Sequence, residues 1–535
     1  MTTGPMPDKP KISIPKRQLS ARLASLSAEF NHLSPEEIEN LLLHYSPVSA
    51  PQPGQGSSSA PALRLIEAVN SEDVLLWHTS QPEAYATVKV VGHQETMRTN
   101  STQFRGWLRN TDYQRHHKAC SASALNDAIE QISVKAKTEG EEKPVFVRVG
   151  HAQGNIYIDM CDSRWRVIEV TPTGWSVIDN CNVHFERNMG ALALPEPERG
   201  GSIADLWRFV NVVDWRDRAQ LATWLIFALW PKGPYPILVL HGRPGSAKST
   251  AGTVLRSLID PFMGGNQGAP ESNRDMQIAA SNCWLLAYNN ISFVETWFSD
   301  ACARLATGSG LRLRKLHTDR EEIIFESQRP ILMNGIEEFA SKSDFLDRSL
   351  VVRLPEINED KRIDEATFEA AFKQANGKIF GSILHALSSA LCRYPSIHPP
   401  RSPRMADFYR VGIAAEEAIG LNPGEFSDAY LYNKAEANNQ ALESSAIYEP
   451  LRKLLTDQPI VWDVSATDLL ANLESNSTER TQKRRGWPKT PKSLGNTLER
   501  LGSNLRAAGI EITRMDRDPV TRRRMFRIEK LESWK

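Results

Sequence analysis

The sequence lacks the features that are typical of membrane-spanning and exported proteins, and its cysteines form no recognisable metal or redox motif. The 535 residues contain no long apolar run of the kind that spans a bilayer, and no signal peptide opens the chain. We therefore expect neither a membrane-spanning nor an exported protein. The six cysteines form no C-x-x-C pair and have no metal-site histidine pattern near them. Reduced structural thiols in a cytoplasmic protein are the default interpretation of such cysteines.

The chain also lacks net charge, because 64 Lys and Arg residues balance 64 Asp and Glu residues. No overall electrostatic field therefore attracts it to nucleic acid. The charge is nevertheless unevenly distributed. Residues 479–535 contain 16 Lys and Arg residues but only 7 Asp and Glu residues. This local excess of positive charge indicates an anionic partner for the C-terminal end.

The segment PILVLHGRPGSAKST, residues 236–250, combines a short apolar run with a loop rich in glycine and proline. The apolar run predicts a buried parallel strand, and the loop then brings Lys248 to the start of a helix. Backbone N–H groups of such a loop turn inward and bind phosphate oxygens at the positive end of the helix. The residues predicted to bind nucleotide in this way are Gly242, Gly245, Ser246, Ala247, Lys248, Ser249 and Thr250.

Within this P-loop pattern, Lys248 would reach the β- and γ-phosphates of ATP, and Ser249 would bind Mg²⁺. Ala247 stands where the pattern G-x-x-x-x-G-K-[ST] has its second glycine. The added methyl group is tolerated if the backbone angle φ of Ala247 is negative. The alternative is a chance glycine-rich turn, which the preceding strand and the following helix-forming residues disfavour.

A second predicted strand lacks the acidic residue that P-loop ATPases place beside the metal. The apolar run in CWLLAYNNIS, residues 283–292, ends in Asn289 and Asn290. An asparagine hydrogen-bonds a Mg²⁺-bound water, but it supplies no charge and cannot act as a general base. We expect Asn289 to stand at the metal. Glu295 is the nearest downstream carboxylate that could substitute as a catalytic acid, unless it is only an acid at a helix N-terminus.

Composition and periodicity divide the chain into five parts. Residues 1–62 hold a disordered tail, short helices and a Pro/Gly/Ser linker, and residues 63–200 form an α+β accessory domain. Residues 201–395 form the ATPase with a helical lead-in. A helical connector over residues 396–447 then leads to a basic domain over residues 448–535.

The accessory domain is predicted to have an antiparallel sheet and no catalytic site. Strands are expected at ATVKVVG, FRGWLRN, VFVRVG, NIYIDM, WRVIEV and GWSVID, with one helix at SALNDAIEQISVKA. Its histidines lack the spacing of metal ligands and are expected to be ordinary surface or core residues. Asp159 and Asp162 are three residues apart, which puts them on opposite faces of a continuous strand and away from a shared metal.

The basic domain shows two helices, ATDLLANL and KSLGNTLERLGSNLRAA, followed by the strands GIEITRM and RRRMFRIEK. This order is typical of a winged helix, whose second helix enters the major groove while the hairpin follows the DNA backbone. Contacts of this kind to phosphates give affinity without sequence reading. The predicted contact residues are Lys489, Lys492, Arg500, Arg522, Arg523, Arg524 and Arg527. A winged helix that binds protein is the alternative.

Several segments jointly resemble one family, namely GRPGSAKST, YNNIS, RKLHTDREEIIFE, RPILMNGI and DFLDRSLVVRLPEI. They are similar to the superfamily-three-like (AAA+) helicase ATPases that are attached to primases in prophages and integrative elements. The resemblance runs from residue 80 to residue 530. Alanine at position 247 is ordinary in such P-loops, whereas the second acidic strand usually reads Asp-Asn. Asn289 is therefore a departure that bears on metal binding and turnover.

The resemblance also implies roles by position. Asn334 would orient the attacking water, and Arg348 would be an arginine finger presented to the γ-phosphate of a neighbouring subunit. The alternative for Arg348 is an ion pair with Asp347 or Asp344. A hairpin lining the pore of a ring would grip DNA phosphates through Arg312, Arg314, Lys315 and His317.

The sequence thus predicts an α/β protein with a P-loop NTPase core, an N-terminal α+β domain and a C-terminal winged helix. We expect a cytoplasmic ATPase of the DNA helicase type that acts in mobile-element or phage replication and uses ATP and Mg²⁺. A homo-oligomeric ring such as a hexamer would hold single-stranded DNA in its pore, with duplex DNA at the winged helix. One alternative is an ATP-binding, slowly hydrolysing DNA-binding switch. Another is an adaptor that recruits a primase through residues 16–45.

Overall fold

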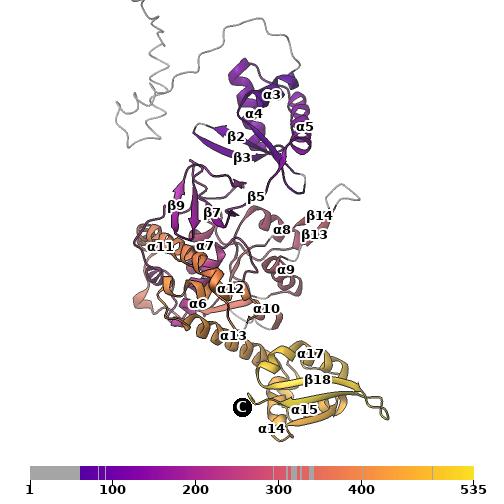
Figure 1. Ribbon diagram of the computed structural model, residues 1–535. Helices are drawn as coiled ribbons and strands as arrows, with labels where there is room; N and C mark the ends of the chain where they lie inside the picture. Colours follow the sequence, from indigo (N-terminus) through magenta and orange to yellow (C-terminus); the bar gives the residue numbers. More distant parts are fainter. Residues whose placement is uncertain are drawn as a thin grey trace, which may run out of the picture. The chain divides into compact units, whose positions relative to one another are not determined.

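The computed structural model in Figure 1 describes residues 61–535, except for positions 82, 91, 293, 309–310, 315–321, 326–327, 336–342, 401, 485 and 535. The helices expected within residues 16–45 lie outside the described residues, as do Lys315 and His317. No helix in the described part is long and apolar enough to cross a membrane. The chain is a mixed α/β protein with a largely helical C-terminal region.

Residues 61–142 combine three helices with one sheet around a core of their own. The helices are α3 (Pro61–Ser71), α4 (Thr102–His116) and α5 (Ala122–Thr138). The strands run in the order β3-β2-β1-β4 and comprise β1 (Leu75–His78), β2 (Ala84–Val90), β3 (His93–Arg98) and β4 (Glu141–Glu142). Leu65, Val88, Leu108 and Ile129 belong to one buried apolar cluster that joins the helices to the sheet.

The segment FRGWLRN, expected to be a strand, lies inside α4. Phe104 and Leu108 are four residues apart, so both fall on one helical face, and both are fully buried. Ser101 caps the helix, because its side chain accepts a hydrogen bond from the Phe104 N–H. The strand prediction was wrong here because a short apolar window fits the helical period as well as the strand period.

The next sheet is antiparallel and belongs to a different core. It runs β6-β7-β8-β9, made of β6 (Val149–Ala152), β7 (Asn155–Asp159), β8 (Val167–Thr171) and β9 (Gly174–Ile178). A separate parallel pair joins β5 (Val145–Phe146) to β10 (His184–Phe185). Ile158 and Val170 pack in the apolar cluster that also contains the central helices and sheet. The predicted 63–200 region therefore holds two four-stranded sheets with separate cores, where the sequence pattern suggested one sheet.

The central sheet is parallel and positions the candidate site. Its strands run in the order β12-β15-β11-β16 and comprise β11 (Ile237–His241), β12 (Leu286–Tyr288), β15 (Ile331–Gly335) and β16 (Ser349–Arg353). Leu238 and Leu240 face one large apolar cluster, whereas Ile237 and Val239 face the other. Both faces of the sheet are therefore buried, which explains the continuous apolar runs in the sequence of these strands.

Helices cover both faces of this sheet, as its two buried clusters show; many of these helices are labelled in Figure 1. The large cluster that includes Leu238 also includes residues of α6 (Trp215–Ala228), α7 (Lys248–Ile259), α11 (Glu365–Arg393) and α12 (Ala406–Ala415). The cluster on the opposite face includes residues of α8 (Asn273–Asn282), α9 (Thr296–Thr307), α10 (Ser343–Asp347) and α13 (Glu425–Ser444). Short 3₁₀ turns lie at η1 (Ile203–Arg208), η3 (Glu359–Lys361), η4 (Tyr394–Ser396) and η5 (Glu417–Ile419). An antiparallel hairpin pairs β13 (Leu311–Arg314) with β14 (Glu322–Phe325).

The C-terminal unit has its own apolar core, which includes Leu451, Leu469, Leu498 and Phe526. Its helices are α14 (Tyr448–Thr456), α15 (Ala466–Ser475), α16 (Glu479–Gln482) and α17 (Pro491–Ala507). Its sheet has the order β17-β19-β18, made of β17 (Val461–Ser465), β18 (Ile510–Arg517) and β19 (Arg524–Lys530). The two helices and two strands predicted for this region are present, while α14, β17 and the short α16 were not predicted.

Candidate functional site

The loop over residues 242–247 joins the end of β11 to the start of α7, so the predicted order of strand, loop and helix is confirmed. Gly242 is required by close packing, because a Cβ there would lie 2.4 Å from the Leu354 carbonyl oxygen and 2.6 Å from Ser246 Oγ. Gly245 has a φ of +82°, a conformation that favours glycine. Among the described residues, no side chain caps the N-terminus of α7. The loop therefore leaves the positive helix end available to an anion.

Ala247 departs from the expectation for its backbone. Its φ is +60°, in the left-handed region, whereas tolerance of alanine was predicted for a negative φ. The loop thus keeps the backbone conformation for which glycine is best suited. Holding an alanine there costs about 1 kcal/mol, which the surrounding contacts offset.

Lys248 is the first residue of α7, and its side chain folds back over the loop. Its Nζ donates hydrogen bonds to the carbonyl oxygens of Gly242, at 2.6 Å, and Arg243, at 2.8 Å. The residue is only 8% exposed, and burial lowers the pKa of the Lys248 ammonium. A positive charge therefore lies at the centre of the loop with little water around it.

The structure brings the two residues predicted to bind metal into direct contact. The Ser249 hydroxyl donates a hydrogen bond of 2.9 Å to Asn289 Oδ1. Ser249 is the second residue of α7, while Asn289 directly follows β12, so two segments of the chain about 40 residues apart meet here. The pair provides two oxygen atoms and no negative charge.

Asn334 lies at the same edge of the sheet. It pairs in register with Leu240 of β11, just before the loop. Its Oδ1 accepts a 2.9 Å hydrogen bond from the Asn290 backbone N–H, and its Nδ2 lies 3.4 Å from the Lys248 carbonyl oxygen. Asn334 therefore links the end of β12 to the first turn of α7.

The hydrogen bond that the structure shows for the Glu295 side chain does not connect it to this cluster. It is exposed and precedes α9 as the N-cap residue. Its Oε2 accepts a hydrogen bond of 2.7 Å from the Trp297 indole N–H. The geometry favours the predicted alternative of an acid at a helix N-terminus.

Arg348 lies at the far end of the same strands from the loop. Its carbonyl oxygen accepts a hydrogen bond from the Ile237 N–H, at the start of β11, whereas the loop follows the end of β11. The five residues of β11 separate the two ends by about 16 Å. Asp347, one alternative partner of Arg348, lies 3.1 Å from Arg404. Arg348 is thus placed away from the 242–247 loop of its own chain.

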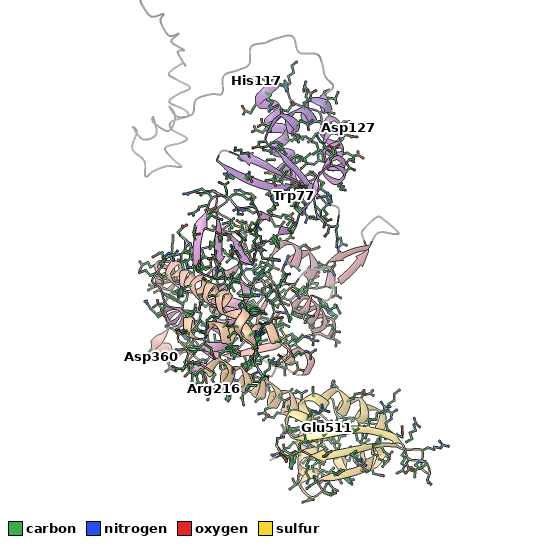
Figure 2. The ribbon with its side chains drawn as sticks, viewed as in Figure 1. Trp77, His117, Asp127, Arg216, Asp360 and Glu511 are labelled. Carbon is green, nitrogen blue, oxygen red and sulfur yellow. The ribbon has the colours of Figure 1, made fainter. Side chains whose placement is uncertain are left out.

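The predicted DNA-binding residues fall in two places. Arg312 and Arg314 lie on β13, in register with Ile324 and Glu322 of β14. In the C-terminal unit, the side chains drawn in Figure 2 include an exposed set at α17 and the β18–β19 hairpin. That set contains Lys489, Lys492, Arg500, Arg514, Arg517, Arg522, Arg523 and Arg527, with Arg524 half-buried.

Two of the hairpin arginines lie beside carboxylates of the described chain. Arg527 makes two hydrogen bonds of 2.8 Å to the Asp463 carboxylate, and Arg523 lies 3.1 Å from Asp468. Both pairs are solvent-exposed, so each contributes little to stability and is readily exchanged for a phosphate. They do not prevent this surface from binding an anion.

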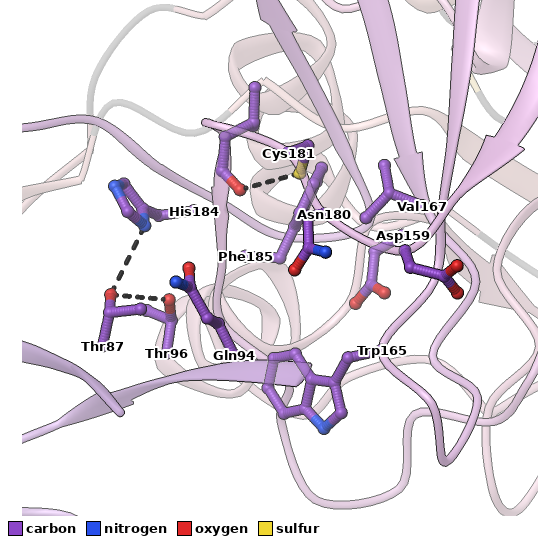
Figure 3. A pocket seen from close by; sticks show the side chains of 12 residues that line it. Thr87, Gln94, Thr96, Asp159, Trp165, Val167, Asn180, Cys181, His184 and Phe185 are labelled. Carbon is purple, nitrogen blue, oxygen red and sulfur yellow. Dashed lines mark hydrogen bonds between the residues drawn. The ribbon is translucent and has the colours of Figure 1, made fainter. Parts of the chain in front are cut away.

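A separate small pocket lies beside β7 and β10 (Figure 3). Its two lining carboxylates, Asp159 and Asp179, each have an arginine partner. Asp159 is buried and accepts hydrogen bonds from Arg187, while Asp162 pairs with Arg166. Burial, followed by the Lys143 ammonium, lowers the pKa of His184 to about 4, so this pocket histidine is neutral at pH 7. Within the described part of the chain, no group of three His, Cys, Asp or Glu residues is placed to hold a metal ion.

Comparison with protein families gives two matches. Residues 203–433 match the actinomycete integrative conjugative element replication protein, and residues 447–533 match the AICE RepA C-terminal domain. The chain is similar to replication proteins of a mobile element. The first match contains the central sheet and the 242–247 loop, and the second contains the C-terminal unit from just before α14 through β19.

The comparisons with curated proteins and with solved structures add no further evidence. No curated protein matches the chain. One apo A-form structure of the NrS-1 C-terminal region has 11% identity and a TM-score of 0.40, covering 87% of this chain and 99% of that one. Another apo structure of the same region has 11% identity and a TM-score of 0.39, covering 89% of this chain and 100% of that one. Both TM-scores are too low to bear on fold or function.

Proposed function

We propose that this protein is an ATP-dependent DNA motor of the helicase type that acts in the replication of a mobile element. Its core would be a P-loop ATPase of the superfamily-three-like (AAA+) class. The observation that carries the proposal is the convergence of Lys248, the Ser249–Asn289 pair and Asn334 at one edge of a parallel sheet. Ligands of open α/β sheets bind at this edge, outside the carboxyl ends of the strands.

The loop would bind the phosphates of ATP through its backbone N–H groups and the N-terminus of α7. Lys248 now donates to the carbonyl oxygens of Gly242 and Arg243. On binding, its ammonium would turn to the β- and γ-phosphates, which present negative charge in place of neutral carbonyls. Because Lys248 is almost fully buried, this contact is screened little by water.

Mg²⁺ fits the oxygen donors beside the loop. Ser249 Oγ and Asn289 Oδ1 are 2.9 Å apart, and Mg²⁺ commonly takes few protein ligands, with water and phosphate oxygens completing its shell. When bound with ATP, Mg²⁺ neutralises charge on the phosphates. Asn334, next to Lys248, would orient the attacking water through its amide. The Ser249–Asn289 pair carries no charge, so turnover would depend on these amides and on a neighbouring subunit.

We infer a ring because Arg348 lies at the opposite end of β11 from the loop of its own chain. A finger arginine at this place would serve the phosphate of the next subunit. Mixing Arg348→Ala subunits with Lys248→Ala subunits is therefore expected to restore part of the ATP hydrolysis that each variant lacks alone. Phosphate release measures this rescue, and light scattering with ATP and DNA should give a mass several times that of one chain. No rescue together with a monomeric mass would exclude the ring.

The C-terminal unit would be a winged helix that binds duplex DNA, while Arg312 and Arg314 would contact single-stranded DNA in the ring. Replacing Arg522, Arg523 and Arg524 together by glutamine should weaken duplex binding. The slope of log affinity against log salt should become shallower by up to about 3, because three phosphate contacts are lost. Fluorescence anisotropy at several salt concentrations measures both effects. As the matched control, replacing Arg105, Arg109 and Arg115 on α4 by glutamine should change neither the duplex affinity nor the salt slope. Equal losses in both triple variants would refute the hairpin site.

A second function is favoured by Asn289, which supplies no charge at the metal. In this case the protein would be an ATP-binding, slowly hydrolysing DNA-binding switch. DNA-stimulated phosphate release by the intact chain, absent from Lys248→Ala, is expected of the motor, whereas ATP binding without such stimulation would favour the switch. Recruitment of a primase through residues 16–45 stays a prediction.

A further inference from the structure

Asn266, which no sequence pattern singles out, lies in the loop between α7 and α8, directly beside β12. Gly264 and Gly265 have positive φ values and turn the chain sharply before it. The next residue, Gln267, then donates its N–H to the Ala287 carbonyl oxygen at 2.9 Å and accepts from the Asn289 N–H at 2.6 Å. The loop is therefore fixed to the strand that carries Asn289, and the two glycines are the sequence signal for this turn.

The side chain of Asn266 lies against Gly252, one turn of α7 beyond Ser249. A Cβ at Gly252 would lie 2.7 Å from Asn266 Nδ2 and 3.5 Å from Asn334 Nδ2. Ser249 and Gly252 are three residues apart and so share one face of the helix. Asn289 contacts that face at Ser249, while Asn266 and Asn334 contact it at Gly252. Three asparagine side chains thus converge on one face of α7 because Gly252 leaves room for two of them.

One oxygen atom of this cluster differs from the others in its hydrogen bonding. Asn266 Oδ1 is buried and has no hydrogen-bond partner among the described residues. Leaving such an acceptor unsatisfied costs about 1 to 3 kcal/mol. By contrast, Asn334 Oδ1 and Asn289 Oδ1 each accept a hydrogen bond. A ligand that brings O–H donors to this face would satisfy the Asn266 amide, and a hydrated cation does so through its water molecules.

We propose that Asn266 is a positioning residue for Mg²⁺ that accompanies ATP. Its Oδ1 accepts a hydrogen bond from a water molecule in the shell of the cation, beside the direct donors Ser249 and Asn289. The inference rests on the proposed ATP site and deepens it. It gives the site a third neutral oxygen beside the uncharged Ser249–Asn289 pair, and it assigns Gly252 the role of keeping this amide in place.

The test is a Mg²⁺ titration of the binding of a fluorescent, non-hydrolysable ATP analogue to the full chain. Asn266→Ala should raise the Mg²⁺ concentration at half-maximal binding about tenfold, as is typical when a residue behind a metal ligand is lost. Asn266→Asp should lower it, because the carboxylate attracts the cation. Gly252→Ala should raise it as well, because the added methyl group displaces the Asn266 amide. Analogue binding in EDTA should be the same in all these variants.

Asn273→Ala is the matched control, because Asn273 Oδ1 is also buried without a partner but lies at the start of α8. Its Mg²⁺ midpoint should equal that of the wild type. An equal shift in Asn273→Ala and Asn266→Ala, or unchanged midpoints in both Asn266 variants, would overturn the assignment while leaving the ATP site standing. Failure of the wild type to bind the analogue at any Mg²⁺ concentration would instead reject the proposed function itself, and the role of Asn266 with it.

Discussion

Replacing Lys248 with alanine is expected to weaken ATP binding by about 100-fold, since a charge-assisted contact to phosphate contributes up to about 3 kcal/mol. The ammonium lies almost fully buried above the loop, held by the carbonyl oxygens of Gly242 and Arg243. Neither Ser249 nor Thr250 can replace that charge. DNA-stimulated phosphate release should be lost together with ATP binding.

Equilibrium binding of a fluorescent ATP analogue measures this effect, with melting followed by circular dichroism to show that the variant remains folded. Lys248→Met separates charge from volume, because it keeps the length of the side chain but should bind as weakly as Lys248→Ala. Lys373→Ala removes an exposed lysine of α11 and should bind the analogue as the wild type does. If Lys248→Ala retained wild-type affinity, the 242–247 loop would not be the nucleotide site.

Replacing Asp260 with alanine is expected to produce the largest loss of stability, about 3 to 5 kcal/mol, because it leaves a buried arginine without its counter-ion. Arg148 and Asp260 form an ion pair of 2.8 Å in which the two side chains are 1% and 3% exposed. Asp260 also accepts hydrogen bonds from the backbone N–H groups of Trp284 and Leu285. The pair therefore joins the residue before β6, the C-cap of α7 and the approach to β12.

The midpoint of urea unfolding, followed by tryptophan fluorescence, measures this loss. Asp179→Ala breaks the exposed pair between Asp179 and Arg164, at 3.7 Å, and should leave the midpoint nearly unchanged. The double variant Arg148→Met/Asp260→Leu should be more stable than Asp260→Ala alone, because no unpaired charge remains buried. A double variant no more stable than the single one would show that the loss comes from packing rather than from the charge.

The acid dependence of stability should follow His184. Its pKa is lowered to about 4 in the folded protein, by burial first and then by Lys143. An unfolded histidine titrates near pH 6.5. The unfolded state therefore binds more protons between these two values, and this group makes stability fall as pH drops from about 6.5 to about 4.

The sequence by itself determined those parts of the site and fold that depend on neighbouring residues. An apolar strand, a glycine-rich loop and the start of a helix are contiguous over residues 236–250, so their order followed from local periodicity and backbone preference. The helix and hairpin order of the C-terminal unit was predictable for the same reason. The placement of Asn289 beside Ser249 was also expected, because both residues were predicted to bind the same metal ion.

Only the tertiary structure decided which distant segments meet. It divided the predicted accessory domain between two cores, gave Ala247 a positive φ, and left Glu295 with a partner in its own helix. It also placed Asn266 against Gly252 and buried Arg148 with Asp260, a residue 112 positions away. Such contacts depend on how helices and sheets pack, and packing selects partners by shape and burial over the whole chain. Periodicity within a short window carries no information about that choice.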